Sequence, residues 1–248
     1  MLPHNTERIL GMLGEDALVL DVGGWAAPFN RATHMLDVMP YESRGGLIPG
    51  GYGPGPERFG PDTWTIRDMC DREPWPYGDD VFDFAVCITT LEDIRDPIWV
   101  CSELARVAKA GYVEVPTVLA ELVYSRTEAC VGHAHHRWLC EIEDGGLVFM
   151  HKWHSLNGDW RVRVVPRWQE SMTMEDHLQG LFWEGELPAR ERVVVGAYPT
   201  DEIVARVRER FSPSPLELRL KRMRAEALPR VARPVRRMAE RVLGGLRA

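Results

Sequence analysis

The sequence predicts an α/β protein with a mostly parallel sheet, an added antiparallel hairpin and a helical C-terminal tail. In the first half, short apolar runs of strand length alternate with helical patterns, the order that gives parallel strands joined by right-handed crossovers. Residues 137–154 then form two runs around Asp144-Gly145, a pair typical of a type I′ hairpin turn. From Asp201 onward, apolar residues recur at helical spacing among many arginines.

Five segments of the first half have the length and apolar content of strands. Residues 17–22 and 82–89 are almost continuous apolar runs, as expected of parallel strands covered on both faces. Together with the intervening helices, the segments predict a Rossmann-like sheet. The predicted strands are Ala17–Val22, Thr33–Val38, Thr63–Asp68, Phe82–Thr89 and Gly111–Pro116.

Two helices are expected in this half. Residues 5–13 predict a short helix capped by Asn5 or Thr6. Residues 96–109 predict an amphipathic helix, and Asp96-Pro97 is a favourable start for it because proline fits the first helical position.

Composition divides the rest of the chain. Residues 44–62 contain seven glycines and four prolines, so we expect a long irregular loop there. Residues 192–198 predict a late strand. We expect one large domain over residues 1–200 and a basic helical extension over residues 201–248.

The charge is distributed unevenly between these two parts. The net charge is −7, but the last 48 residues carry 13 basic against 6 acidic side chains, a balance of +7, which leaves −14 on the first 200. An acidic body argues against a broad nucleic-acid interface. We expect the basic helix to pack on the body or on a second copy in a homodimer. Peripheral contact with an anionic membrane surface is the alternative, although Pro229 and Pro234 interrupt the amphipathic face.

The cysteines and apolar runs point to a cytoplasmic protein, or one that is peripheral at the inner membrane face. The five cysteines are scattered without a CxxC pair, which is typical of reduced, buried thiols. The sequence shows no apolar run of about 18 residues and no N-terminal signal pattern.

The first predicted strand runs into Asp21-Val22-Gly23-Gly24-Trp25. Ligands of open α/β sheets bind at the carboxyl ends of the strands, and glycine permits close approach of a backbone to a ligand. Asp37 ends the second strand, where an acidic side chain can accept both hydroxyls of a ribose. Gly23 and Asp37 are only 14 residues apart, against about 20 in dinucleotide folds, so NAD and FAD are disfavoured. The first crossover helix must be short, one or two turns around residues 28–32.

Several linked motifs resemble the class I S-adenosylmethionine-dependent methyltransferases, in particular the methyltransferase type 11-like group. The resemblance covers about Leu18 to Thr117. Its motifs are "LVLDVGG", "LDVMP", "RDMCDREPWPYGDDVFDF", "LEDIRDP" and "ELARVAKAG".

This resemblance implies a cofactor, S-adenosyl-L-methionine, and a set of residues that hold it. The implied positions are Asp21, Gly23 and Gly24 beside the methionine part, Asp37 on the ribose hydroxyls, Asp68 and the Met69 backbone at the adenine edge, and Cys87, Ile88 and Thr89 along the pocket wall. The sequence departs from the family pattern at Trp25 and Ala27, where later glycines are usual. Trp25 could cover the cofactor or fill its pocket. The family's usual histidine after Leu-Glu is replaced by Asp93.

The second half contains five of the eight histidines, between residues 133 and 154. Pairing about the Asp144-Gly145 turn sets Cys140 opposite Phe149 and His135 opposite His154. One face of the hairpin would carry Trp138, Cys140, Ile142, Leu147, Phe149 and His151. The histidines would divide into His133, His135 and His154 on one side and His136 and His151 on the other.

These histidines allow three interpretations. The first is acid–base catalysis, with His133 or His136 as the base, because histidine titrates near neutral pH. The second is a metal site, although no standard ligand spacing such as HExxH is present, and we assign no metal ligands from sequence. The third is packing of the hairpin against the sheet. Under the first interpretation, the acceptor would be held by Tyr124, His135, Trp138 and His154, with Trp153 stacking on a ring.

The sequence therefore predicts a methyltransferase that acts on oxygen of a saccharide, glycolipid or other small metabolite. The alternative is a non-catalytic relative that uses the histidine-rich hairpin for binding or metal sensing.

Overall fold

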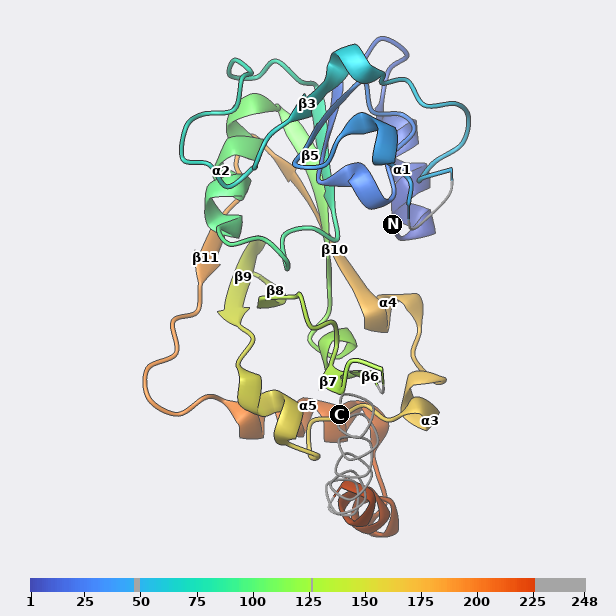
Figure 1. The fold of residues 1–248 in the computed structure, drawn as a ribbon, viewed down its shortest axis with the longest axis vertical. Coiled ribbons are helices and arrows are strands. Elements are labelled where there is room, and N and C mark those ends of the chain that lie inside the picture. The colour runs from blue at the N-terminus through green and yellow to red at the C-terminus, as the bar shows by residue number, and fades with distance from the viewer. Residues whose placement is uncertain (47–49, 126, 226–248) are drawn as a thin grey trace, which may run out of the picture.

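The computed structural model describes residues 1–46, 50–125 and 127–225 (Figure 1). Its helices and strands alternate in the first half and become shorter and more irregular in the second. They are α1 (Pro3–Met12), β1 (Val19–Val22), β2 (His34–Asp37), β3 (Trp64–Ile66), β4 (Phe84–Ile88), α2 (Pro97–Val107), β5 (Ala110–Pro116), β6 (Tyr124–Ser125), β7 (Cys130–Val131), β8 (Trp138–Glu143), β9 (Gly146–His151), α3 (Pro166–Gln169), α4 (Met174–His177), β10 (Leu178–Glu184), β11 (Ala189–Glu191) and α5 (Thr200–Phe211).

The predicted α/β fold is confirmed. A six-stranded sheet has the order β10-β5-β4-β1-β2-β3, in which the first five strands of the chain run parallel and β10 is antiparallel. All residues of β1 and β4 are buried, as their continuous apolar runs predicted. We call this sheet, with α1 and α2, the sheet lobe.

The connection from β1 to β2 differs from the prediction. The short helix expected around residues 28–32 is absent. The connection contains only a 3₁₀ turn, at Gly24–Ala26. The reason is competition for the backbone groups: the Asn30 amide donates to the Tyr52 carbonyl, and the Tyr52 amide donates to Pro28. The Asn30 side-chain amide also donates to carbonyls of the glycine-rich loop, at Gly50, Gly53 and Gly55.

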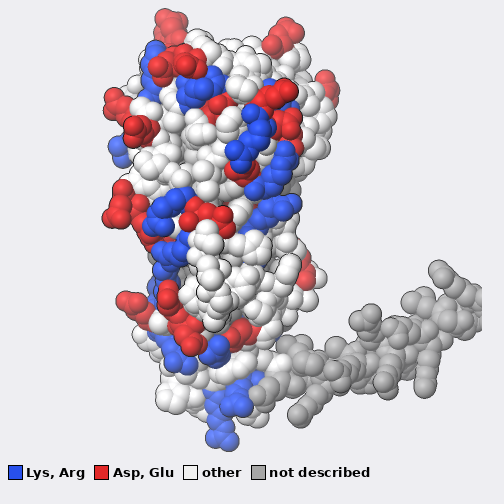
Figure 2. All heavy atoms as spheres, turned by 90° about the vertical axis from the view of Figure 1, so that its left-hand side faces the viewer, with Lys and Arg blue, Asp and Glu red and all other residues white. Residues whose placement is uncertain are grey.

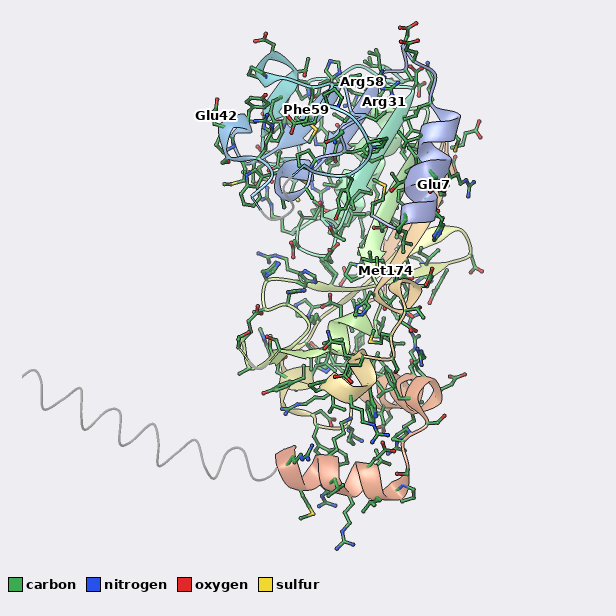
Figure 3. All side chains as sticks on the ribbon, turned by 90° about the vertical axis from the view of Figure 1, so that its right-hand side faces the viewer. Glu7, Arg31, Glu42, Arg58, Phe59 and Met174 are labelled. Atoms are coloured by element: carbon green, nitrogen blue, oxygen red, sulfur yellow. The ribbon has the colours of Figure 1, made fainter. Side chains whose placement is uncertain are left out.

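Arg31 and Arg58 bind the loop that precedes β1. They lie near each other at the top of the sheet lobe (Figure 3). Both donate to the Glu15 carbonyl, at 3.1 and 2.9 Å, and Arg31 also reaches the Ala17 carbonyl at 3.2 Å. They fix the loop that leads into β1.

The two predicted helices of this lobe are present. α2 starts where expected, with the Asp96 carboxylate accepting the Trp99 amide and Pro97 in the first turn. α1 starts at Pro3, earlier than predicted, and no side chain caps it. Asn5, predicted as its cap, instead donates its side-chain amide to the Tyr112 hydroxyl at 2.7 Å.

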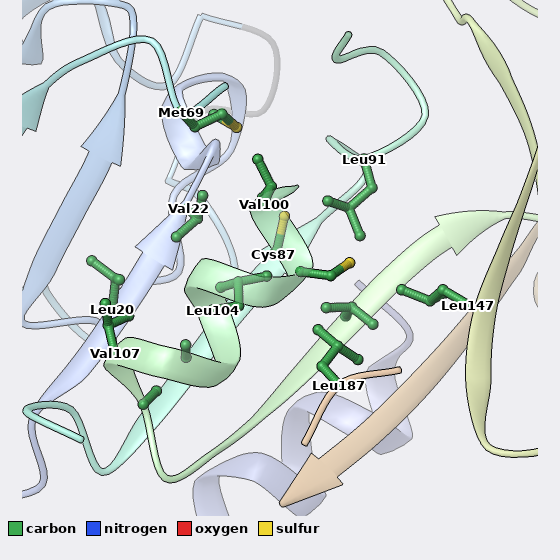
Figure 4. Close-up of a cluster of buried hydrophobic side chains, with 14 of the residues drawn as sticks. Leu20, Val22, Met69, Cys87, Leu91, Val100, Leu104, Val107, Leu147 and Leu187 are labelled. Atoms are coloured by element: carbon green, nitrogen blue, oxygen red, sulfur yellow. The ribbon is translucent and has the colours of Figure 1, made fainter. Parts of the chain in front are cut away.

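The main apolar core fills the space between α2 and the sheet (Figure 4). Val100, Leu104 and Val107 of α2 face Leu20 and Cys87 on the strands, and all five are fully buried. At about 0.8 kcal/mol per buried methylene, this contact is a large part of the lobe's stability.

The hairpin β8–β9 has the predicted register. Cys140 lies opposite Phe149, and Glu143 lies opposite Gly146. The face predicted to carry Trp138 packs on the main core except for His151, which is exposed, and the Trp138 ring lies edge-on to Phe149. The other face, with Leu139 and Met150, packs into a second core. The hairpin thus joins two cores through the two-residue period of its strands.

The prediction that the ladder continues to His135 and His154 is wrong. The strands end at Trp138 and His151 because the Arg137 and Trp138 amides both donate to the Glu92 carbonyl. The side assignment of the histidines falls with it, as described below.

The second core belongs to what we call the histidine lobe, formed by the described residues of 117–137 and 152–177 together with α5. Segments far apart in the sequence lie together in this lobe (Figure 1), and their apolar side chains form the second core. They include Val118, Leu122, Val131, Trp153, Val164, Trp168, Ile203 and Val207. The first helix of the predicted basic extension is therefore part of this core.

The predicted late strand at residues 192–198 is absent. Edge pairing is supplied earlier, by β10 along the whole of β5, and by β11 along β9. Val193 and Val195 are exposed, at 68% and 90%. Their apolar, β-branched pattern indicated a strand, but both neighbouring edges are already occupied.

The C-terminal extension is described only in part. α5 ends at Phe211, with Ser212 as its C-cap before Pro213, and residues 215–225 form a further helix. The predicted break near Pro213 and Pro215 is therefore confirmed. The predicted breaks at Pro229 and Pro234 and the amphipathic face beyond residue 225 lie outside the described residues. Within those residues, no helix is long and apolar enough to cross a membrane. Acidic and basic side chains are interspersed on the face shown in Figure 2.

Candidate active site

A cleft of about 1160 Å³ lies between the sheet lobe and the histidine lobe. Its upper wall contains a residue at or just after the carboxyl end of each of the five parallel strands. These residues are Gly23, Asp37, Met69, Thr89 and Pro116. The lower wall contains Glu121, Tyr124, Glu128, His133, His135 and His136. The cleft is therefore where an open α/β sheet binds its ligand.

Gly23 forms the first turn of this cleft. Its φ of +79° lies in the left-handed region, and a Cβ there would overlap the Thr90 side chain. Its amide donates to the Leu36 carbonyl at 2.9 Å. Only glycine fits this position without strain, and the result is a bare backbone facing the cleft.

Asp37 is the acidic side chain of the upper wall. One carboxylate oxygen accepts the Trp25 amide at 3.1 Å, and the other accepts the Met39 amide at 2.8 Å. Each oxygen retains an acceptor site, so a vicinal diol is a suitable partner. Burial raises the pKa of Asp37.

Trp25 forms a side wall of the cleft and leaves the cleft open. Its indole Nε1 donates to the Ser43 hydroxyl at 2.9 Å, and its carbonyl accepts the Gly45 amide at 2.8 Å. Both bonds hold the tryptophan against the segment that follows β2. Of the two predicted possibilities, the arrangement agrees with covering a ligand.

Asp21 lies behind the turn, outside the residues that line the cleft. Its carboxylate accepts the Phe29 amide at 2.8 Å and lies against Gly24, which leaves no room for a Cβ there. Burial raises the pKa of Asp21 to about 7. Asp21 and Gly24 shape the turn but do not line the cleft, so their predicted contact with the methionine part is wrong.

The predicted adenine end departs from expectation at Asp68. Burial would raise the pKa of this carboxyl, but an ion pair with Arg95 and the Cys70 amide hold it below its usual range. Asp68 does not line the cleft, whereas Met69 does. Among the described residues, no hydrogen bond uses the Met69 amide, so this donor is available to a ligand.

The end of β4 also separates two predicted residues. Cys87 is fully buried in the main core beneath α2 (Figure 4), so its predicted place on the pocket wall is wrong. The alternation of the strand directs it to the face opposite Ile88. Thr89 lines the cleft and has a φ of +46°, an unusual conformation for a β-branched residue.

The described residues fit S-adenosylmethionine at three points. The Gly23 turn admits the methionine part, Asp37 can accept the ribose hydroxyls, and the Met69 amide can donate to the adenine edge. Asp68 does not take its predicted part. The fit therefore rests on backbone groups and on one carboxylate.

Three imidazoles gather in the lower wall. The ring centroids of His133 and His136 are 4.7 Å apart, those of His135 and His136 are 4.8 Å apart, and those of His133 and His135 are 5.4 Å apart. The predicted division of His135 and His136 between two sides is wrong, because residues 132–137 leave the ladder and form a loop.

A chain of buried charged groups holds His136. Its Nδ1 lies 2.5 Å from Glu121 Oε1, and the other Glu121 oxygen accepts from Lys152 Nζ at 2.6 Å. Burial would raise the pKa of Glu121, but His136 and Lys152 lower it below its usual range. Lys152 also donates to the His133 carbonyl at 3.0 Å. Asp93 faces the Nε2 atoms of His135 and His136, at 3.7 Å from each.

His133 differs from its two neighbours. No hydrogen bond among the described residues reaches its ring, while the ring lines the cleft. Burial, and then the neighbouring His136, lower the pKa of His133. This shift favours the neutral imidazole, whose unprotonated ring nitrogen is the atom that can accept a proton.

Of the predicted acceptor residues, Tyr124 and His135 line the cleft and two do not. Trp138 packs on the main core and donates its indole N–H to the Ile94 carbonyl at 2.9 Å. His154 is exposed at the start of a 3₁₀ turn. Trp153, expected to stack on an acceptor ring, is buried and stacks on Tyr198 instead.

Sequence reasoning missed several cleft residues. Glu121 and Glu128 line the cleft, and Lys152 donates to Glu121 from behind it, but no motif or period marks these residues. Glu92 is buried in the cleft wall, and burial raises its pKa well above the usual range. Isolated carboxylates carry no periodic signal, but Glu92-Asp93 directly after a predicted strand could have been singled out by position.

No family model matches the sequence, and no curated protein matches it. Solved structures with a similar fold include S-adenosylmethionine-dependent methyltransferases from Mesorhizobium loti and Aquifex aeolicus, and an arsenic(III) S-adenosylmethionine methyltransferase from Chlamydomonas reinhardtii. They are 16%, 19% and 18% identical to this chain, with TM-scores of 0.33, 0.30 and 0.29. The alignments cover 59%, 46% and 41% of this chain, and 63%, 65% and 39% of the respective structures.

The chain thus spans about half the length of the solved structures that it matches. The fold class rests on the strand order of the chain itself, with five parallel strands and an antiparallel sixth at the β5 edge. This order is that of a Rossmann-like fold with one antiparallel edge strand.

Proposed function

We propose that the protein is an S-adenosylmethionine-dependent methyltransferase that acts on a hydroxyl oxygen of a small molecule. One observation carries the proposal: a single cleft is lined both by the Gly23–Asp37 pocket at the strand ends and by the three imidazoles. A cofactor bound at the strand ends and an acceptor bound by the histidine lobe would therefore meet inside it.

The chemistry needs a donor, an acceptor and a base. S-adenosylmethionine, when bound, supplies an electrophilic methyl group on a sulfonium. In such a transfer the S–C bond would break as the O–C bond forms, and His133 would take the proton of the acceptor hydroxyl. The chain contributes orientation of the acceptor and a site for the proton.

His133 is the better base of the two predicted. Its ring has no hydrogen-bond partner within the described part of the chain, and its pKa is lowered by burial and by His136. Both nitrogens of His136 face carboxylates, Nδ1 towards Glu121 and Nε2 towards Asp93. We therefore assign proton transfer to His133 and assign His136 to the acceptor side of the wall.

The lining of the cleft suits a mixed polar and apolar acceptor. Tyr124 lines the cleft, and the guanidinium carbon of Arg163 lies over its ring, 4.3 Å from the ring centre. Gln169 and His177 add hydrogen-bonding groups to the same wall. A saccharide, a glycolipid head group or a phenolic metabolite fits such a lining.

Cofactor binding is tested by calorimetry with S-adenosylmethionine on the wild type, Asp37→Asn and the control Asp62→Asn. Asp62 is acidic and exposed on a 3₁₀ turn away from the cleft. We expect Asp37→Asn to weaken binding at least about 30-fold, because the diol loses a charged acceptor, and the control to bind like the wild type. Folded protein that binds no cofactor at millimolar concentration would overturn the proposal and favour a non-catalytic binding protein.

The base is tested with tritiated methyl donor and a panel of small hydroxylic acceptors. We expect His133→Gln to lower the transfer rate about 100-fold without changing cofactor affinity. The wild-type rate should rise with pH through an inflection below the usual histidine pKa, and the variant should lack this inflection. His154→Gln, outside the cleft, is the matched control. An unchanged rate in His133→Gln would refute the assignment of the base.

A further inference from the structure

We infer that Asp93, His135 and His136 form a binding site for one divalent transition-metal ion in the wall of the cleft. No metal ligands were assigned from the sequence. The inference comes from the loop at residues 132–137, which turns two consecutive histidines towards the same carboxylate.

The geometry of the three donors is close to that of a metal site. His135 Nε2 lies 3.7 Å from one Asp93 oxygen, and His136 Nε2 lies 3.7 Å from the other. All three donor atoms lie within 4.8 Å of one another. Ligands at about 2.0 to 2.2 Å from a metal are separated by roughly 3 Å, so a small contraction completes the set. His135 is exposed and free to make that movement.

His136 already has a carboxylate on the ring nitrogen that would face away from the ion. Its Nδ1 is held at 2.5 Å by Glu121, which is only 1% exposed and is balanced by Lys152. A carboxylate on the far nitrogen of a histidine is the arrangement that orients metal ligands and fixes Nε2 as the coordinating atom. This contact fixes the ring whether or not a metal is present.

An unsatisfied oxygen marks the position of the cation. Asp93 Oδ1 is buried and has no hydrogen-bond partner among the described residues, although it faces the His136 ring. Asp93, Glu121 and Glu128 surround the site, and Lys152 is the nearby cation that opposes them. A buried carboxylate oxygen without a partner is costly, and a bound cation would remove that cost.

The donor set also selects the class of ion. Two imidazoles and one carboxylate favour zinc, iron(II), manganese, cobalt or nickel over magnesium and calcium, which prefer all-oxygen sites. Three protein ligands leave coordination positions open, as in catalytic sites. These positions face the cleft.

An ion in this place would bind the acceptor. Coordination would hold a hydroxyl of the acceptor in the cleft and lower its pKa. This role rests on the proposed function, and it narrows the acceptor class to molecules with a hydroxyl next to a second oxygen, which can chelate the ion. The site itself depends only on the geometry.

The test is metal binding by tag-free protein that has been stripped with a chelator. Titration with zinc chloride in a calorimeter and with cobalt chloride in an absorption spectrometer should show one ion per chain and the visible d–d bands of cobalt bound to nitrogen and oxygen. We expect Asp93→Asn and His136→Gln each to weaken binding more than about 10-fold. Glu121→Gln should weaken it about 10-fold, because His136 loses the carboxylate that orients its ring. His154→Gln is the control.

Two readouts keep the result interpretable. S-adenosylmethionine affinity close to wild type shows that a metal-site variant is folded, and Asp37→Asn should lose the cofactor while it keeps the metal. Absence of stoichiometric binding at 100 μM metal, or equal loss in His154→Gln, overturns the site. In that case the Asp93 carboxylate is paired with protonated histidines only. Binding of both metal and cofactor without any transfer would reject the proposed function and leave the metal site standing.

Discussion

Three buried carboxylates near the cleft, Asp21 and Asp37 in the sheet lobe and Glu121 in the histidine lobe, are satisfied in different ways. In the sheet lobe, Asp21 and Asp37 accept backbone amides from residues at most 12 positions away in the sequence. In the histidine lobe, Glu121 is satisfied by the side chains of His136 and Lys152, 15 and 31 positions away. The first arrangement follows from the turn and tolerates changes in other side chains. The second depends on three particular side chains and is more easily broken.

The largest effect is expected from breaking the chain of charges in the histidine lobe. Lys152→Met leaves the buried Glu121 carboxylate without its cation and should lower the free energy of unfolding by about 3 to 5 kcal/mol. Adding Glu121→Gln to the variant should recover part of the loss, because no uncompensated charge then remains. Urea unfolding of the single and double variants measures both values.

The matched control is Lys109→Met, which breaks the Lys109–Asp83 ion pair on the surface. Both of its partners are about half exposed, so water replaces the lost contact and little change is expected. A loss as small in Lys152→Met as in Lys109→Met would remove the distinction between the lobes.

The second effect concerns pH and the sheet lobe. Burial raises the pKa of Asp21 to about 7 from an unfolded value near 3.8, so its ionisation opposes folding. The cost is absent below about pH 4 and grows to its full size above pH 7. Asp21→Asn stays neutral, so its stability relative to the wild type should increase between pH 4 and pH 8, by up to about 4 kcal/mol.

The prediction concerns how the difference in unfolding free energy between Asp21→Asn and the wild type changes with pH. A packing cost of the asparagine would be the same at every pH and would not alter that change. Urea unfolding at pH 5, 6, 7 and 8 measures it. The stability of Asp83→Asn relative to the wild type should change with pH in the opposite direction. The Lys109 hydrogen bond lowers the pKa of Asp83, so the ionised carboxylate stabilises the wild type above about pH 4 and this stabilisation is lost at lower pH. A flat difference between Asp21→Asn and the wild type would show that Asp21 is not buried as a neutral acid.

The same contrast explains which features the sequence predicts. The strands that end at Val22, Asp37 and Ile88 were found because an apolar run of fixed length is a local pattern, and the parallel order then brings their ends to one edge. The hairpin register was found because Asp144-Gly145 selects one turn type. Asp37 reached its predicted place in the cleft for the same reason, since its position is set by its own strand.

The histidine lobe could not be predicted in this way. His136 faces Glu121 because the Glu92 carbonyl accepts two amides and stops the β8 strand, a contact between residues more than 40 positions apart. The alternation of side chains in a strand predicts opposite sides for His135 and His136, but the strand ends at Trp138 and does not include them. Asp68 departs from its predicted place for a different reason: its carboxylate pairs with the Arg95 side chain, a contact that the motif pattern does not specify.

The smallest effect is expected at Thr89, where the two lobes meet. Its backbone has a φ of +46°, its amide donates to the Glu114 carbonyl at 2.7 Å, and its side chain lines the cleft. Thr89→Gly should raise the free energy of unfolding by about 1 kcal/mol, because the relief of strain exceeds the entropic cost of glycine. It should also weaken S-adenosylmethionine binding several-fold, because the cleft loses the hydroxyl and methyl groups of the side chain.

The comparison that sharpens this prediction is Asp80→Gly. Asp80 also has a positive φ, +53°, but lies outside the cleft. Its substitution should change stability in the same direction by less, since aspartate tolerates this conformation better than threonine, and should leave cofactor affinity unchanged. If Thr89→Gly lowered stability instead, the loop after β4 would be held by the threonine side chain itself. The conformation of the loop at the carboxyl edge of the sheet would then depend on a particular side chain, as the contacts of Glu121 do. The contrast between backbone contacts in the sheet lobe and side-chain contacts in the histidine lobe would not hold at the cleft.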